Sequence, residues 1–419
     1  MPSPSPSPVF LNPSAKSWRY TPPSPTGNHP PPTDTETKTE TPVQTFHRLL
    51  PNHAPTPLHS LPAVATALNL AHVLLKDESH RAGLPSFKIL GASWAVYRAV
   101  AAALGIDAIS NLLSPSKPPQ KNGPPFDPLT SLGAAARAAG RRLTLVTCTE
   151  GNWGRAVARM AAYVGVAVVV YVPAHVPEAT RGLIRGEGAE VRVVEGDYDD
   201  AAGAARRAAG EGGGEGGGDG AVLVMDIGWE GFEVVPQWVV EGYQTMLDES
   251  DAQVLRMTGG RPATHAVVPV GCGSVAQAVA QHFKSATRER GVDSPAAAVL
   301  AVELDTAACL RASLENGTMV SVPTGDSIMC GMNCGTLSTT AWPILKLGID
   351  GTVVVSDVEA HNAVQELEVH GFKAGPCGSS TLAALEKSCK TERVNLGLSE
   401  ESIVVLYCTE GHREYITPV

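Results

Sequence analysis

The fold of this chain is decided by residues 143–172, which read LTLVTCTEGNWGRAVARMAAYVGVAVVVYV. Residues 143–149 form a short β-rich run, residues 153–163 follow as a helix, and residues 166–172 form a second, almost wholly apolar strand. Strands this uniformly apolar are typical of a parallel sheet that is covered on both faces. The segment therefore predicts an α/β fold.

The same alternation continues on both sides of this stretch. The further expected elements are a helix at 178–185, a strand at 190–194, a helix at 199–209, strands at 221–226 and 265–270, a helix from about 275, and strands at 298–304, 352–356 and 403–408. This order predicts two three-layer α/β/α lobes with mostly parallel sheets.

Composition divides the chain further. Residues 1–43 are rich in Pro, Ser and Thr, which predicts a disordered tail. Low-complexity stretches predict surface insertions at 111–130 and 210–220. We expect a large domain built from 44–90 and 236–419, and a small domain from 91–235.

The charge and hydropathy of the chain exclude several classes of partner. The formal net charge of −10 argues against nucleic acid and anionic membranes, which attract clustered Lys and Arg. The longest apolar stretch, residues 160–172, is well short of the ~20 residues that cross a bilayer. The start of the chain lacks a signal-peptide core, which favours a cytoplasmic location, with an organellar transit peptide as the less favoured alternative. The eight cysteines show no metal-ligand spacing, so no metal site is predicted.

Ligands of open parallel sheets bind at the carboxyl ends of the strands. One such loop, Gly271-Cys-Gly-Ser274, precedes a helix, whose first N–H groups and positive dipole end suit a phosphate. An alternative is a dinucleotide fingerprint, because Gly271, Gly273 and Ala276 fit G-x-G-x-x-A and Glu303 closes the next strand. A glycine-rich turn without a ligand is a third interpretation.

Lys88 is the second candidate, in Leu84-Pro-Ser-Phe-Lys-Ile-Leu-Gly-Ala92. Apolar neighbours predict a lowered pKa for Lys88, which favours Schiff-base chemistry. An ordinary solvated surface lysine is the alternative interpretation.

From Lys76-Asp-Glu-Ser79 to Cys408-Thr-Glu-Gly411 the chain resembles the fold type II pyridoxal-phosphate enzymes, the tryptophan synthase β-subunit superfamily. Within that superfamily its nearest resemblance is to the diaminopropionate ammonia-lyases. The similar segments stand in the family's order: Ser86-Phe-Lys-Ile-Leu-Gly-Ala92, Glu150-Gly-Asn-Trp-Gly-Arg-Ala-Val157, Asp197-Tyr-Asp-Asp200, Trp229-Glu-Gly231, Pro236-Gln-Trp238, Glu241-Gly-Tyr243, Val302-Glu303, Ile328-Met-Cys-Gly-Met-Asn-Cys-Gly335 and Thr409-Glu-Gly411.

The resemblance implies a role for each candidate. Lys88 would bind pyridoxal 5′-phosphate covalently, and Asn152 would hydrogen-bond its phenolic oxygen. The loop of Gly271, Cys272, Gly273 and Ser274 would hold its phosphate, and Cys408 would lie beside its pyridine nitrogen as a neutral partner. Glu150 and Asp226 would divide the acid–base work.

The implied activity is α,β-elimination of a small amino acid, most simply 2,3-diaminopropionate to pyruvate and ammonia, by a homodimer. Glu150, Trp153 and Phe372-Lys-Ala-Gly375 depart from the lyases, which carry Asp, His and Gly-Glu-Ser-Gly there. A serine or threonine dehydratase or a β-replacement enzyme is therefore an alternative. Two alternatives from other functional classes also stay open: the chain could be a catalytically inactive binding protein or an NAD-dependent oxidoreductase.

Overall fold

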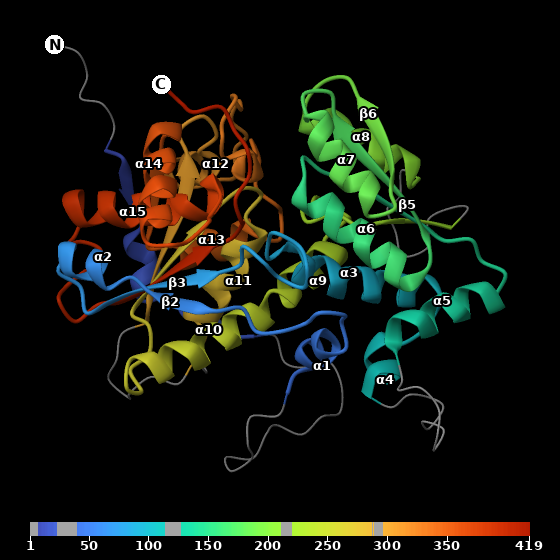
Figure 1. The fold of residues 1–419 in the computed structure, drawn as a ribbon, viewed down its shortest axis with the longest axis horizontal. Coiled ribbons are helices and arrows are strands. Elements are labelled where there is room, and N and C mark those ends of the chain that lie inside the picture. Colours follow the sequence, from blue (N-terminus) through green and yellow to red (C-terminus); the bar gives the residue numbers. More distant parts are fainter. Residues whose placement is uncertain (1–6, 23–39, 114–126, 211–219, 287, 289–295) are drawn as a thin grey trace.

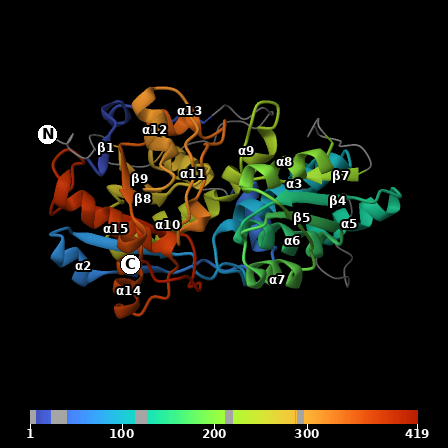
Figure 2. The same cartoon turned by 90° about the horizontal axis from the view of Figure 1, so that it is seen from above.

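The computed structural model describes residues 7–22, 40–113, 127–210, 220–286, 288 and 296–419. Within these residues the strands form two sheets, of seven strands in the order β1-β10-β9-β8-β11-β3-β2 and four in the order β6-β5-β4-β7. Figures 1 and 2 show the larger sheet in the left half of the molecule and the smaller in the right. The strands are β1 (Val9–Leu11), β2 (Leu58–Ser60), β3 (His72–Asp77), β4 (Thr144–Cys148), β5 (Ala167–Pro173), β6 (Glu190–Val194), β7 (Ala221–Leu223), β8 (His265–Pro269), β9 (Ala298–Leu304), β10 (Gly351–Val355) and β11 (Ile403–Cys408).

The pairing of the strands confirms the predicted fold class. In the described residues all pairings of the smaller sheet are parallel. The larger sheet is parallel from β10 to β3 and has one antiparallel strand at each edge, β1 and β2. β8 and β11 are buried along their whole length, because helices cover both faces of the sheet.

Helices lie on both faces of each sheet, and alternate strand residues meet different helices. In β4, Leu145 packs in the hydrophobic cluster that includes α6, whereas its neighbour Val146 packs in the cluster that includes α8. The helices are α1 (Pro42–Arg48), α2 (Pro62–Ala67), α3 (Lys88–Ala103), α4 (Ala108–Leu113), α5 (Pro128–Ala138), α6 (Asn152–Val164), α7 (Glu178–Gly186), α8 (Tyr198–Ala208), α9 (Val234–Gly242), α10 (Gln244–Met257), α11 (Ser274–Phe283), α12 (Cys309–Asn316), α13 (Trp342–Gly348), α14 (Asp357–Val369) and α15 (Pro376–Thr391), with 3-10 turns η1 (Pro13–Lys16) and η3 (Cys330–Met332).

Helix α3 holds the position of Lys88 by close packing on α9. The two helices touch at glycines: a Cβ on Gly242 would lie 2.5 Å from Leu90 O, and one on Gly91 would lie 2.7 Å from Tyr243. Because neither glycine carries a side chain, the two backbones approach closely. This contact fixes the first turn of α3 against the end of α9.

The prediction of a disordered tail over 1–43 is wrong for residues 7–22, and α1 begins at Pro42 inside that range. β1 pairs with β10, and Asn12 donates from Nδ2 to the carbonyls of Lys346 and Ile349, both at 2.9 Å. The pairing with β1 satisfies backbone groups that the edge strand β10 would otherwise expose, and Asn12 satisfies carbonyls at the end of α13. Residues 1–6 and 23–39 lie outside the described residues.

The predicted insertions are shorter than expected, since α4 extends to Leu113 and α5 begins at Pro128. Residues 114–126 and 211–219 lie outside the described residues. The domain boundaries stay a prediction.

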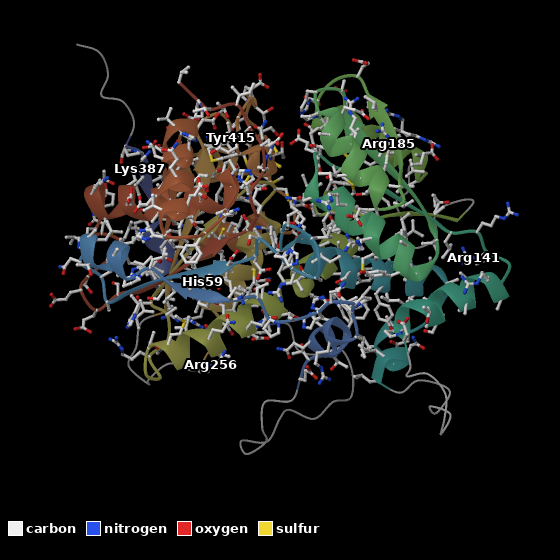
Figure 3. The ribbon with its side chains drawn as sticks, viewed as in Figure 1. His59, Arg141, Arg185, Arg256, Lys387 and Tyr415 are labelled. Atoms are coloured by element: carbon white, nitrogen blue, oxygen red, sulfur yellow. The ribbon has the colours of Figure 1, made fainter. Side chains whose placement is uncertain are left out.

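No helix of the described chain is long and apolar enough to span a membrane. The basic side chains of Arg141, Arg185 and Arg256 lie far apart on the outside of the molecule, and that of Lys387 is partly buried beside Glu359 (Figure 3).

Candidate active site

Lys88 and Asp226 form an ion pair that joins the start of α3 to the loop after β7. Lys88 is the first residue of α3, and Asp226 follows β7 by three residues. Nζ of Lys88 donates to Oδ2 of Asp226 at 2.7 Å, and the two side chains are 21% and 5% exposed. The sequence named both residues, and the structure brings them into direct contact.

This contact corrects the expected acidity of Lys88. Burial alone lowers the pKa of Lys88, but the Asp226 carboxylate opposes it, and the net effect is a pKa raised above the ordinary lysine value. The apolar neighbours of Lys88 in the sequence predicted a lowered pKa, which is wrong. The partner that raises the pKa, Asp226, is 138 residues away in the sequence. A neutral Lys88 amine therefore requires that its proton be passed on, and Asp226 is the adjacent acceptor.

The loop between β8 and α11 has the form of an anion cradle. Gly273 has φ +95°, and a Cβ there would lie 2.9 Å from Leu345 Cδ1. In the described part of the chain no backbone acceptor pairs with the N–H groups of Cys272 or Gly273. Thr339 Oγ1, on a neighbouring loop, is buried and also lacks a hydrogen-bond partner among the described residues. Unpaired donors at a helix N-terminus fit the phosphate of the cofactor.

Ser338, which the sequence did not single out, ties this cradle to the Asp226 loop. Its N–H donates to Cys272 O at 2.8 Å, and its hydroxyl accepts from Gly228 N–H at 2.8 Å. Cys272 Sγ also donates to Asp226 O at 3.3 Å. Burial raises the pKa of Cys272 to about 11, so it stays a neutral thiol.

Asn152 and Cys408 meet around Glu410, a second residue that the sequence left without a role. Asn152 is the first residue of α6 and donates from Nδ2 to Glu410 Oε2 at 3.4 Å. Glu410 Oε1 accepts from Cys377 N–H at 3.2 Å, and the Cys408 thiol donates to Glu410 O at 3.7 Å. Burial raises the pKa of Cys408, which fits a neutral partner for a pyridine nitrogen. An acid just after the last strand of a parallel sheet was the signal for Glu410.

Glu150 lies apart from the Lys88–Asp226 pair. Its Oε1 is 2.9 Å from His175 Nε2, and within the described residues it makes no hydrogen bond to Lys88 or Asp226. Burial is the main cause of the raised pKa of Cys334, and the carboxylates of Glu150 and Asp226 both add to it, so the two acids act on one thiol. Burial raises the pKa of Glu150 itself, against the opposing effect of His175.

Glu303 occupies the place of the ribose-binding acid in the dinucleotide alternative. It is buried, and its carboxylate accepts from the N–H groups of Leu310 at 2.7 Å and Arg311 at 2.8 Å, at the start of α12. Both oxygens are thus engaged by the fold, which gives Glu303 a structural role.

Comparison with known proteins agrees with this geometry. Residues 49–409 match the family of pyridoxal-phosphate dependent enzymes. Diaminopropionate ammonia-lyase of Salmonella typhimurium is 33% identical over 73% of this chain and 69% of its own. The holo crystal structure of diaminopropionate ammonia-lyase from Escherichia coli is 26% identical, with a TM-score of 0.75 over 88% of each chain.

The structure of the processed form of threonine deaminase isoform 2 from Solanum lycopersicum shares the fold. Its TM-score is 0.63 over 89% of this chain and 87% of its own, at 17% identity. The predicted fold type and cofactor are confirmed by these relatives together. With its cradle, its lysine and this match over most of its length, the chain belongs to the pyridoxal-phosphate dependent enzyme family.

Proposed function

We propose that this enzyme catalyses α,β-elimination of a small amino acid, with 2,3-diaminopropionate converted to pyruvate and ammonia. The observation that carries the proposal is the Lys88–Asp226 ion pair at 2.7 Å, adjoining the cradle of Gly271, Cys272, Gly273 and Ser274. Relatives with 29% and 33% identity, from Escherichia coli and Salmonella typhimurium, are diaminopropionate ammonia-lyases.

Each residue has a distinct task in this proposal. Pyridoxal phosphate, when bound, supplies the electron sink that weakens the Cα–H bond of an amino acid. Lys88 would hold the cofactor, Asn152 would contact its phenolic oxygen, Cys408 would stay neutral beside its pyridine nitrogen, and Gly271–Ser274 would hold its phosphate.

Two acids serve the substrate. Glu150 accepts the Cα proton, alone or in alternation with Lys88, and its burial-raised pKa makes it a stronger base than a solvated carboxylate. Asp226 takes up the Lys88 proton and delivers a proton to the departing β-amine, since an amine leaves well only when protonated. The low exposure of Asp226 restricts water at that step.

The test is a panel of D- and L-amino acids, including 2,3-diaminopropionate, serine and threonine, scored for keto acid and ammonia. We expect 2,3-diaminopropionate to have the highest kcat/KM. A higher kcat/KM for serine or threonine would instead identify a dehydratase, the alternative that the altered segment Phe372-Lys-Ala-Gly375 leaves open.

We also propose that the enzyme is a cytoplasmic homodimer. The acidic charge of the chain, which disfavours anionic membrane surfaces and nucleic acid, supports the location. Light scattering of the holoenzyme tests the dimer, and a mass of one chain, 43.6 kDa, would contradict it.

A further inference from the structure

Glu150 and His175 are brought together by the topology of the smaller sheet. β4 and β5 pair in parallel with Cys148 opposite Tyr171, so their carboxyl ends lie side by side. Glu150 follows the first strand and His175 the second, and Oε1 and Nε2 are 2.9 Å apart. The contact therefore joins two loops that open on the same edge of the sheet.

The two ends of this pair lie in different surroundings. The Glu150 side chain is 13% exposed, whereas that of His175 is 54% exposed. His175 thus connects a largely buried carboxylate to bulk water. Other groups that act electrostatically on or with Glu150 are Arg413, Lys88, Cys148, Cys330 and Cys334.

The two cations among these groups are engaged elsewhere. Lys88 bonds Asp226, and Arg413 donates to the Cys330 thiol. Among the described residues, His175 is the one titratable side chain within hydrogen-bond distance of Glu150.

We propose that His175 is the proton-transfer and positioning residue of Glu150, an inference that rests on the proposed function. After Glu150 has accepted a proton, its carboxyl O–H donates to Nε2 of the neutral imidazole. Nε2 takes that proton, Nδ1 releases its own proton to water, and Glu150 returns to the carboxylate form. Proton exchange with water at the exposed imidazole then restores the Nδ1–H tautomer for the next cycle. One proton leaves the site for each cycle, and no electron is exchanged. The longer side chain of Glu150, compared with aspartate, reaches the outer loop where His175 lies.

The activity test uses the holoenzyme in weak buffer. His175→Ala is expected to lower kcat for elimination about tenfold or more with KM little changed, and added imidazole is expected to restore most of the loss. His175→Gln, which keeps a polar side chain but cannot relay a proton, should show the same loss. His370→Ala, at the end of α14, is the matched control and should be unaffected. Unchanged kcat in His175→Ala, or a loss that imidazole does not restore, would overturn the proposal.

A second readout does not depend on turnover. In ¹⁵N-labelled protein without added substrate, the His175 Nε2 resonance should report a hydrogen bond that Glu150→Ala abolishes, and its absence from the wild type would contradict the contact. If the wild type eliminates no amino acid, the proposed function fails separately. Exchange of the alanine Cα hydrogen in D₂O then takes the place of elimination, and equal rates in wild type and His175→Ala, including no exchange in either, would overturn the relay.

Discussion

At the scale of single residues, Asp226 decides the chemistry of Lys88. Asp226→Asn keeps the shape of the side chain but removes the charge that raises the pKa of Lys88 and the proton carrier beside it. We expect kcat for elimination to fall about 10²–10⁴-fold. The control is Asp107→Asn, which changes an exposed acid just before α4. Full activity of Asp226→Asn would show that Asp226 is structural.

His47 makes folding stability depend on pH. It is fully buried, and burial lowers its pKa to about 3 while it bonds Thr245 and Leu90 O. The unfolded chain binds the proton near pH 6.5 and the folded chain does not, so stability falls as pH drops from about 6.5 towards 3. Between pH 7 and 5 the wild type should lose about 2 kcal/mol more of its unfolding free energy than His47→Gln. Equal losses in urea titrations would contradict this.

At the scale of elements, the contact between α3 and α9 fixes where Lys88 begins its helix. Gly242→Ala would place a Cβ 2.5 Å from Leu90 O and should destabilise the protein by about 1–3 kcal/mol while weakening cofactor binding. Gly182→Ala in α7 is the matched control, because a Cβ there meets nothing within 4 Å and should stabilise by about 1 kcal/mol. Thermal unfolding and cofactor titration check both variants, and a neutral Gly242→Ala would mean that the helices can separate without cost.

Apolar runs in the sequence predicted part of the fold. Long apolar strands such as β8, β9 and β11 were placed correctly, because helices on both faces leave an unmistakable apolar run. The strands β1, β2 and β3 were not predicted. β1 and β2 are three-residue antiparallel edge strands, which have no period to detect, whereas β3 is a six-residue strand that ends in polar residues. The strand-end rule named the Asp226 loop, and the apolar helix start and the family resemblance named Lys88. No local signal could reveal that Glu410 bonds Asn152, or that Ser338 joins the Cys272 loop to the Asp226 loop.

At the scale of the whole molecule, the N-terminal segment is part of the large lobe. β1 and Asn12 cover the edge of β10 next to α13. Removing residues 1–12 should lower the melting temperature and promote aggregation through the exposed edge. Asn12→Ala, which loses two hydrogen bonds, should cost about 1–3 kcal/mol. Light scattering during heating tests the truncation, and unchanged behaviour would show that β10 needs no cover.

We expect above all that Lys88 carries pyridoxal phosphate. The most direct measurement is borohydride reduction of the purified holoenzyme followed by peptide mass mapping, with Lys88→Ala treated in parallel. We expect a yellow protein that bleaches on reduction and one pyridoxyl group, attached to Lys88 and absent from the variant. A colourless protein that takes up no added cofactor, or a label on another lysine, would contradict it.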